Sequence, residues 1–202
     1  MTRADPPSPE MTLRYEGDLV RLAALDPEAD AETFARWHAN PMSTRLAGFR
    51  PILPMNKTSA KQKLEEWVKA APDTLNFAIR TLADDRLVGG IGLKDISLHD
   101  ETAELGLSIF QPEDWGKGYG GEAILLTLHY AFDELGLHRV WLTMSSFNER
   151  AFKLYEKLGF CHEGRPRAHP PRWPQMGPAL HGPIARRVQR LSRSTEPSGG
   201  SR

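Results

Sequence analysis

Alternating apolar and polar positions mark the middle of the chain as a set of strands. Leu75, Phe77 and Ile79 alternate with Asn, Ala and Arg, which predicts a strand, and the segments 87–93 and 103–109 continue the apolar pattern. Only short turns separate the three segments. We therefore expect an antiparallel meander.

The residues before the meander carry one strand signal and two helix signals. A short apolar stretch at 18–24 predicts a first strand, and 30–38 has the spacing of a helix that stops before a proline. A second helix is expected near Ser59, which stands at capping-box spacing from Gln62. Between these helices, 45–56 contains two prolines and is expected to be a loop.

Helix and strand signals alternate after the meander. A glycine-rich segment at 116–121 opens a helix, 140–142 predicts a strand, and 148–158 predicts a last helix that ends at Gly159. The resulting order, β-α-α-β-β-β-α-β-α, contains no internal repeat. It predicts an α/β fold with a mixed sheet.

Composition narrows the class of protein. The 202 residues suit one well-cored domain, and 40% hydrophobic with 26% charged residues is ordinary for a soluble protein. No apolar run is long enough to span a membrane, and the polar start does not resemble a secretory leader. The single cysteine, Cys161, favours a reducing, cytoplasmic compartment. The histidines lack the spacing of zinc-binding helices, so no catalytic metal is expected.

The net charge of zero hides an uneven distribution. Residues 165–202 hold eight arginines, one acid and seven prolines, a balance of +7, so the rest of the chain carries −7. Such a basic stretch can neutralise phosphates. It contains one aromatic residue, Trp173, and no folding pattern, so we do not expect a dedicated nucleic-acid binder. The expected division is a disordered tail at 1–10, a folded domain at 11–164 and an irregular tail at 165–202.

Four glycines lie within six positions of a loop that opens a helix, at residues 116–121. Glycine permits a tight turn, and the free N–H groups of a first helical turn attract an anion. Gly116, Gly118 and Gly121 match the dinucleotide pattern G-x-G-x-x-G, but no acid follows the next strand and Walker A spacing is absent. The loop therefore favours another phosphate-bearing ligand, and a turn without a ligand is the open alternative.

Two segments resemble the main motifs of the GNAT acetyltransferase superfamily. The first is the loop around Gly118, and the second is the run NERAFKLYEKLGF from Asn148 to Phe160. The form WGKGYG at 115–120 resembles the branch that contains the ribosomal-protein alanine N-acetyltransferases. Trp115 stands where the wider superfamily usually has Gln or Arg, a change that this branch shares. The resemblance covers about residues 11–163.

The resemblance implies a GNAT-like fold, with a mainly antiparallel sheet flanked by helices and two strands that splay apart around acetyl-CoA. It implies an acetyl-CoA-dependent N-acetyltransferase, an acyltransferase that needs no metal. The third meander strand would pair with the pantetheine arm, and the glycine loop would hold the pyrophosphate. The cofactor-binding residues implied are Ser108, Ile109, Phe110, Trp115, Gly116, Lys117, Gly118, Tyr119, Gly120, Gly121 and Asn148. For Lys117, a role as an ordinary surface lysine is the open alternative.

Tyr155 and Glu104 are the expected catalytic residues. The resemblance implies that Tyr155 protonates the departing thiolate, which suits a phenol because it stays protonated at neutral pH. Some family members place a glutamate on the strand before the last helix, but Thr143 and Met144 stand there. Glu104 is then the best carboxylate to take the proton of the amine, directly or through water. For both residues a structural role is the open alternative.

The expected acceptor is a primary amine, either a protein N-terminus or a small molecule such as an aminoglycoside or polyamine. Transfer is expected to be direct, because Cys161 lies beyond the second motif. The sequence distinguishes neither the two acceptor classes nor a monomer from a homodimer. The alternative is a relative that binds CoA but is catalytically impaired by a defective C-terminal part.

The segment after residue 164 departs from the resemblance. The family continues into one or two strands there, whereas this chain offers mainly proline, arginine and small residues. We therefore expect 165–202 to lack strands, either because it is read out of frame or because it is a native basic tail. A one-base shift of the codons for 180–184 permits Tyr-Met-Gly-Leu-Leu, so the gene sequence distinguishes the two.

Overall fold

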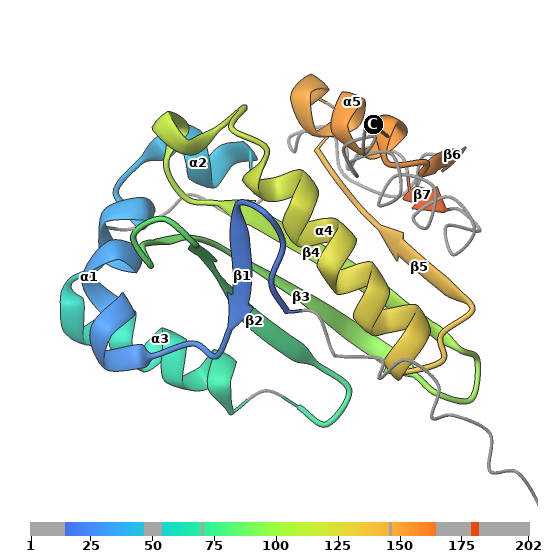
Figure 1. Ribbon diagram of the computed structural model, residues 1–202. Helices are drawn as coiled ribbons and strands as arrows, with labels where there is room; N and C mark the ends of the chain where they lie inside the picture. Colours follow the sequence, from blue (N-terminus) through green and yellow to red (C-terminus); the bar gives the residue numbers. More distant parts are fainter. Residues whose placement is uncertain (1–14, 47–53, 70, 146, 165–178, 182–202) are drawn as a thin grey trace, which may run out of the picture.

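Seven strands form one mixed sheet in the computed structural model, which describes residues 15–46, 54–69, 71–145, 147–164 and 179–181 (Figure 1). The strand order is β1-β2-β3-β4-β5-β7-β6. Neighbouring strands are antiparallel except β4 and β5, which run parallel. The predicted mixed, mainly antiparallel sheet is thus confirmed. The strands are β1 (Val20–Ala23), β2 (Leu75–Thr81), β3 (Leu87–Ser97), β4 (Thr102–Ile109), β5 (Arg139–Leu142), β6 (Cys161–Gly164) and β7 (Ala179–His181).

Helices cover both faces of the central strands. Ala78 of β2 packs into a core with Phe34 and Leu64, from the helices α1 and α3. Its neighbour Ile79 points to the opposite face and joins a second core with Ile124 of α4. The alternation in β2 therefore sorts residues between two cores. The helices are α1 (Pro27–His38), α2 (Pro41–Leu46), α3 (Lys57–Val68), the single turn η1 (Pro112–Asp114), α4 (Tyr119–His129), its continuation η2 (Tyr130–Glu134) and α5 (Glu149–Lys157).

No helix in the described ranges is both long enough and apolar enough to cross a membrane.

Two helix starts differ from the sequence prediction. The side chain of Asn56 accepts from the N–H of Ser59 at 2.8 Å, so α3 begins at Lys57 and the capping box of Ser59 with Gln62 is wrong. An asparagine three residues earlier offers the same chemistry and adds a turn to the helix. The expected loop is also shortened, because α2 reaches Leu46. The remainder of that loop, at 47–53, lies outside the described residues.

A strand lies beyond residue 164, contrary to expectation. Residues 179–181 form β7, which pairs antiparallel with β5 and with β6, a strand that was also not predicted. Backbone hydrogen bonds hold such a pairing, so apolar alternation is not required. The prediction of a tail without strands is wrong at these three residues. Residues 1–14, 165–178 and 182–202, which include the expected N-terminal tail, lie outside the described residues.

One carboxylate joins the start of β1 to the first turn of α4. Glu122 Oε1 accepts from the N–H of Asp18 at 2.8 Å, and Oε2 accepts from Leu19 at 2.8 Å and Val20 at 2.7 Å. Hydrogen bonds to charged groups each contribute about 1.5–3 kcal/mol. The contact therefore fixes α4, and with it the glycine loop, against the sheet.

We expect Glu122→Gln to lower the free energy of unfolding by about 2 kcal/mol or more, because an amide keeps one acceptor oxygen and turns an NH₂ toward backbone donors. Denaturant unfolding at pH 7 measures the change. Glu149→Gln is the matched control, since Glu149 is an exposed first-turn residue of α5. Equal stability of the two variants would contradict the prediction.

Candidate active site

Strands β4 and β5 pair over only three residues before they separate. Their register ends with Glu104 opposite Trp141. β5 stops at Leu142, whereas β4 continues to Ile109. The second half of β4 therefore has no described strand on that side. This separation confirms the predicted splayed pair.

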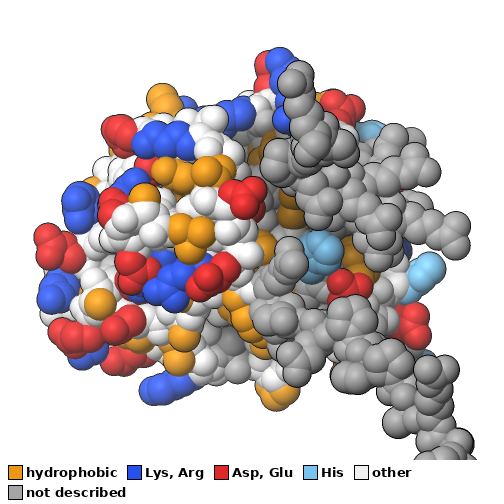
Figure 2. Space-filling model, in the orientation of Figure 1, with side chains coloured by type: hydrophobic (Ala, Val, Ile, Leu, Met, Phe, Trp, Pro, Cys, Tyr) orange, Lys and Arg blue, Asp and Glu red, His pale blue; other side chains and the backbone are white. Residues whose placement is uncertain are grey.

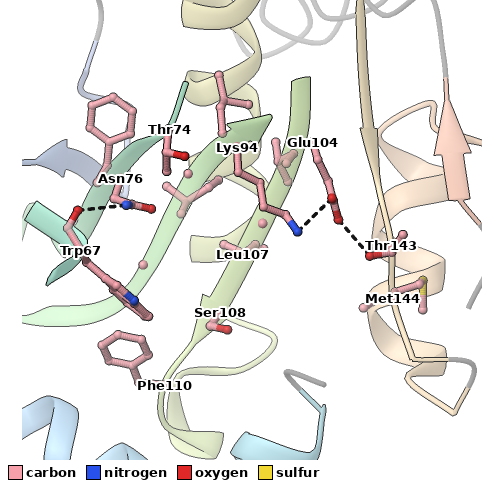
Figure 3. Close-up of a pocket in the computed structure, with 18 of the residues that line it drawn as sticks. Trp67, Thr74, Asn76, Lys94, Glu104, Leu107, Ser108, Phe110, Thr143 and Met144 are labelled. Carbon is pink, nitrogen blue, oxygen red and sulfur yellow. Dashed lines mark hydrogen bonds and ion pairs between the residues drawn. The ribbon is translucent and has the colours of Figure 1, made fainter. Parts of the chain in front are cut away.

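A cavity of about 600 Å³ opens at the separation. Its walls come from β2, β3 and β4 on one side, and from the chain after β5 and α5 on the other. Figure 3 shows Lys94 and Glu104 from the strand side approaching Thr143 from the other side. In the space-filling view of Figure 2, charged and apolar side chains alternate over the described part of the surface. Charged and apolar side chains likewise share this one concave site.

A second cavity, of about 320 Å³, lies beside the glycine loop. The two cavities have six lining residues in common, so they meet between β4 and α5. The shared residues are Leu46, Leu107, Ser108, Asn148, Ala151 and Tyr155. A ligand that fills one cavity can therefore extend into the other.

Most of the predicted cofactor residues gather at the second cavity. Nine of the eleven line it: Ser108, Ile109, Trp115, Gly116, Gly118, Tyr119, Gly120, Gly121 and Asn148. Phe110 lines the first cavity instead, and Lys117 lines neither. Of the predicted catalytic residues, Glu104 lines the first cavity and Tyr155 lines both.

The glycine loop has a backbone shape that few other residues adopt. Gly116 and Gly118 have φ values of +78° and +91°, and Gly118 is the N-cap of α4. A Cβ at Gly120 would lie 3.4 Å from a leucine of β4, and one at Gly121 would lie 3.4 Å from a leucine of α5. The first turn of α4 therefore packs closely at the cavity, where its free N–H groups suit a phosphate.

A buried carboxylate beneath the loop pairs with two cations. Asp114 is 3% exposed, and its oxygens lie 2.7 and 2.9 Å from the two Nη atoms of Arg86. Lys117 Nζ lies 3.1 Å from Asp114 Oδ1. The Arg86 guanidinium, assisted by Lys117, holds the pKa of Asp114 below its usual range. The ammonium of Lys117, which we expected beside phosphates, therefore already has a carboxylate partner.

Trp115 is fixed to the end of β4 and carries an arginine on its ring. Its Nε1 donates to the C=O of Ile109 at 3.0 Å. The guanidinium Cζ of Arg150, the second residue of α5, lies 3.7 Å from the centroid of the Trp115 ring. Arg150 lines the second cavity. Sequence reasoning missed it, although it lies inside the second motif, two positions after Asn148.

The backbone of β4 divides its groups between β3 and the gap. The N–H of Phe110 donates to the C=O of Val88 at 2.8 Å, so it is already engaged, and the ring stacks on Trp37 at 4.5 Å in the core. The expected pairing of this N–H with a cofactor is therefore wrong. Because backbone groups alternate along a strand, those of Ile109 point away from β3, toward the gap.

Tyr155 lies where the two cavities meet. It is 7% exposed and packs edge-on against Phe160, with 5.7 Å between the ring centroids. Burial raises the pKa of Tyr155 to about 12. The phenol therefore keeps its proton at neutral pH and can act as a donor.

Glu104 is buried, and each carboxylate oxygen has a partner. Thr143 Oγ1 donates to Oε1 at 2.9 Å, and Lys94 Nζ lies 2.9 Å from Oε2 (Figure 3). The side chain is 8% exposed, so Glu104 is not a solvated strand-edge residue. A carboxylate offers about four acceptor positions, so two contacts leave room for a proton. These contacts also brace β3, β4 and the chain after β5 at the point of separation.

Asn148 caps α5 as predicted, and it also contacts α2. Its Oδ1 accepts from the N–H of Ala151 at 3.2 Å, and its Nδ2 donates to the C=O of Leu46 at 3.4 Å. On α2, Ser43 lines the second cavity and is 3% exposed, yet its hydroxyl has no hydrogen-bond partner among the described residues. Such a hydroxyl fits a ligand that brings a polar group. It was missed because no helix was predicted at α2.

A known family matches most of the chain. The sequence model of the acetyltransferase (GNAT) domain matches residues 20–161. YokL, an SPbeta prophage-derived uncharacterized N-acetyltransferase of Bacillus subtilis (strain 168), is 36% identical over 103 residues, which are 50% of this chain and 58% of YokL. The chain thus spans less than two-thirds of that relative.

Solved structures share the fold. A structure from T. thermophilus, for which an acetyltransferase is the suggested identity, has a TM-score of 0.74 and 27% identity, covering 96% of this chain and all of that one. A spermidine N-acetyltransferase from Vibrio cholerae, solved with CoA and spermine, has a TM-score of 0.67 and 22% identity over 80% of this chain and 94% of that one. At this identity the second likeness concerns the fold alone.

Proposed function

Since the chain belongs to the GNAT acetyltransferase family, we propose that it transfers the acetyl group of acetyl-CoA directly to a primary amine. The observation that carries the proposal is that a cavity beside a phosphate-binding loop meets a second cavity at Tyr155. The free N–H groups of the loop fit a pyrophosphate, and the unpaired hydroxyl of Ser43 fits a polar group of the pantetheine arm.

The two titratable residues supply complementary proton transfers. Bound acetyl-CoA supplies the acetyl group as a thioester and leaves as the free thiol. Tyr155 gives its Oη proton to the departing sulfur, because a pKa of about 12 keeps that proton in place at neutral pH. Glu104 takes the proton that the amine nitrogen loses, directly or through water. Exchange with solvent then restores both residues, so the net result is an amide and a thiol.

The acceptor amine enters the first cavity. Two carboxylates, Glu66 and Glu104, and one ammonium, Lys94, line it, which favours a cationic amine. The Vibrio cholerae protein, a spermidine N-acetyltransferase, supports a polyamine as the acceptor. The loop sequence at 115–120 resembles the ribosomal-protein branch and supports a protein N-terminus. Both acceptor classes therefore belong in the test.

Two measurements on the full chain test the proposal. Acetyl-CoA at 100 times its Kd should stabilise the folded state by about 2.7 kcal/mol, seen as a rise in Tm. Peptides with free N-termini and polyamines are then screened side by side for thiol release. No rise in Tm would contradict any role for acetyl-CoA. Binding without thiol release from any amine would favour a catalytically impaired relative.

We expect Tyr155→Phe to lower kcat about 10-fold or more, with little change in the Kd for acetyl-CoA, because only the proton donor is lost. The donor must be protonated, so ionisation of Tyr155 should not reduce the wild-type kcat until the pH approaches 12. Tyr130→Phe is the control, since Tyr130 lines neither cavity. A Tyr155→Phe variant that loses only affinity for acetyl-CoA would show that the donor role is wrong.

Glu104→Gln should lower kcat by about 100-fold or more if Glu104 is the general base. Lys94→Met is the matched variant, because it breaks the same ion pair and leaves the carboxylate in place. Steady-state kinetics of both variants should therefore differ sharply in kcat. Equal losses in kcat and in Tm would instead make Glu104 a structural brace.

A further inference from the structure

We propose that Arg150 is the side chain that binds a phosphate group of CoA, and that the ring of Trp115 positions it for that contact. The inference rests on the proposed function, since it concerns the cofactor cavity. Neither the matched family nor the relatives assign a role to Arg150.

The first support is geometric. The guanidinium of Arg150 lies 3.7 Å from the centroid of the Trp115 ring, the face contact of a cation–π interaction. Trp115 is itself held by the hydrogen bond from its Nε1 to Ile109. The planar guanidinium is thus held flat at the cavity, with the N–H donors at its edge directed away from the indole. Preorganisation of this kind reduces the entropy lost when an anion binds.

The second support is the distribution of charge. Lys117 and Arg86 both pair with Asp114. Among the residues that the structure describes, no carboxylate pairs with Arg150. Burial lowers its pKa from the ordinary value, which means that the charge is partly desolvated without a counter-ion. An anion bound beside Arg150 would compensate for that desolvation.

The third support is position. Arg150 lies in the first turn of α5, where the helix dipole disfavours a cation and favours an anion. It lines the second cavity together with Gly116 and Gly118 of the loop, and it also borders a surface cleft lined by Lys153. A phosphate at this place would meet backbone donors on one side and a guanidinium on the other.

Titration calorimetry with CoA tests the proposal on the intact chain and needs no acceptor. Arg150→Gln should weaken CoA binding about 10-fold or more, the usual effect of losing a charge-assisted hydrogen bond. Arg150→Lys should lie between this variant and the wild type, because the charge stays but the planar stack is lost. Lys117→Gln is the matched control and should change affinity far less, since its charge already pairs with Asp114.

The role of Trp115 is tested in the same assay. Trp115→Leu should reproduce most of the loss, and the double variant with Arg150→Gln should lose little more than Arg150→Gln alone. The loss caused by Arg150→Gln should also shrink at high salt, because screening weakens the phosphate contact in the wild type. A merely structural arginine would show no such salt dependence. The ligand-free Tm of Arg150→Gln should match the wild type.

A comparison of CoA with 3′-dephospho-CoA identifies the phosphate. A loss that persists with dephospho-CoA assigns Arg150 to the pyrophosphate, and one that disappears assigns it to the 3′-phosphate. The proposal is overturned if Arg150→Gln binds CoA like the wild type, or if Lys117→Gln loses as much. If the wild type itself fails to bind CoA, the proposed function fails instead.

Discussion

A buried backbone N–H or C=O group needs a hydrogen-bond partner, and the early separation of β4 from β5 leaves the inner edge of β4 without a strand to provide one. β3 satisfies the other edge, as the bond from Phe110 to Val88 illustrates. Trp115 supplies a donor for the carbonyl of Ile109. The remaining edge is open to an extended ligand that carries amide groups of its own, which is what a pantetheine arm offers.

The separation has to be held open, and pairs from distant parts of the chain do so. Glu104 accepts from Thr143 and pairs with Lys94 at the last point where the strands meet. Asn148 connects α5 to α2, and Glu122 connects α4 to β1. The fixed frame lets the glycine loop and Tyr155 approach one ligand from two sides. In the proposed mechanism this arrangement brings the proton donor to the sulfur and the carboxylate to the amine.

Features with local signals could be predicted from the sequence, and features set by distant partners could not. Alternation gave the meander, and clustered glycines gave the loop at 116–121 with its positive φ values. The partner of Lys117 was missed because Asp114 matters only once Arg86 is folded against it. Arg150 was missed because its contact with Trp115 joins two elements. β7 was missed because three residues among prolines pair through their backbone alone.

The central claim is that the open edge of β4 receives acetyl-CoA. Residue-resolved amide hydrogen exchange, with and without acetyl-CoA, tests it most directly. The account predicts that the ligand slows exchange at Ile109 and across 116–121, while Ile79, paired within β1, β2 and β3, is unchanged. Bound acetyl-CoA that leaves exchange at Ile109 and the loop unaltered, and protects another surface, would contradict the account.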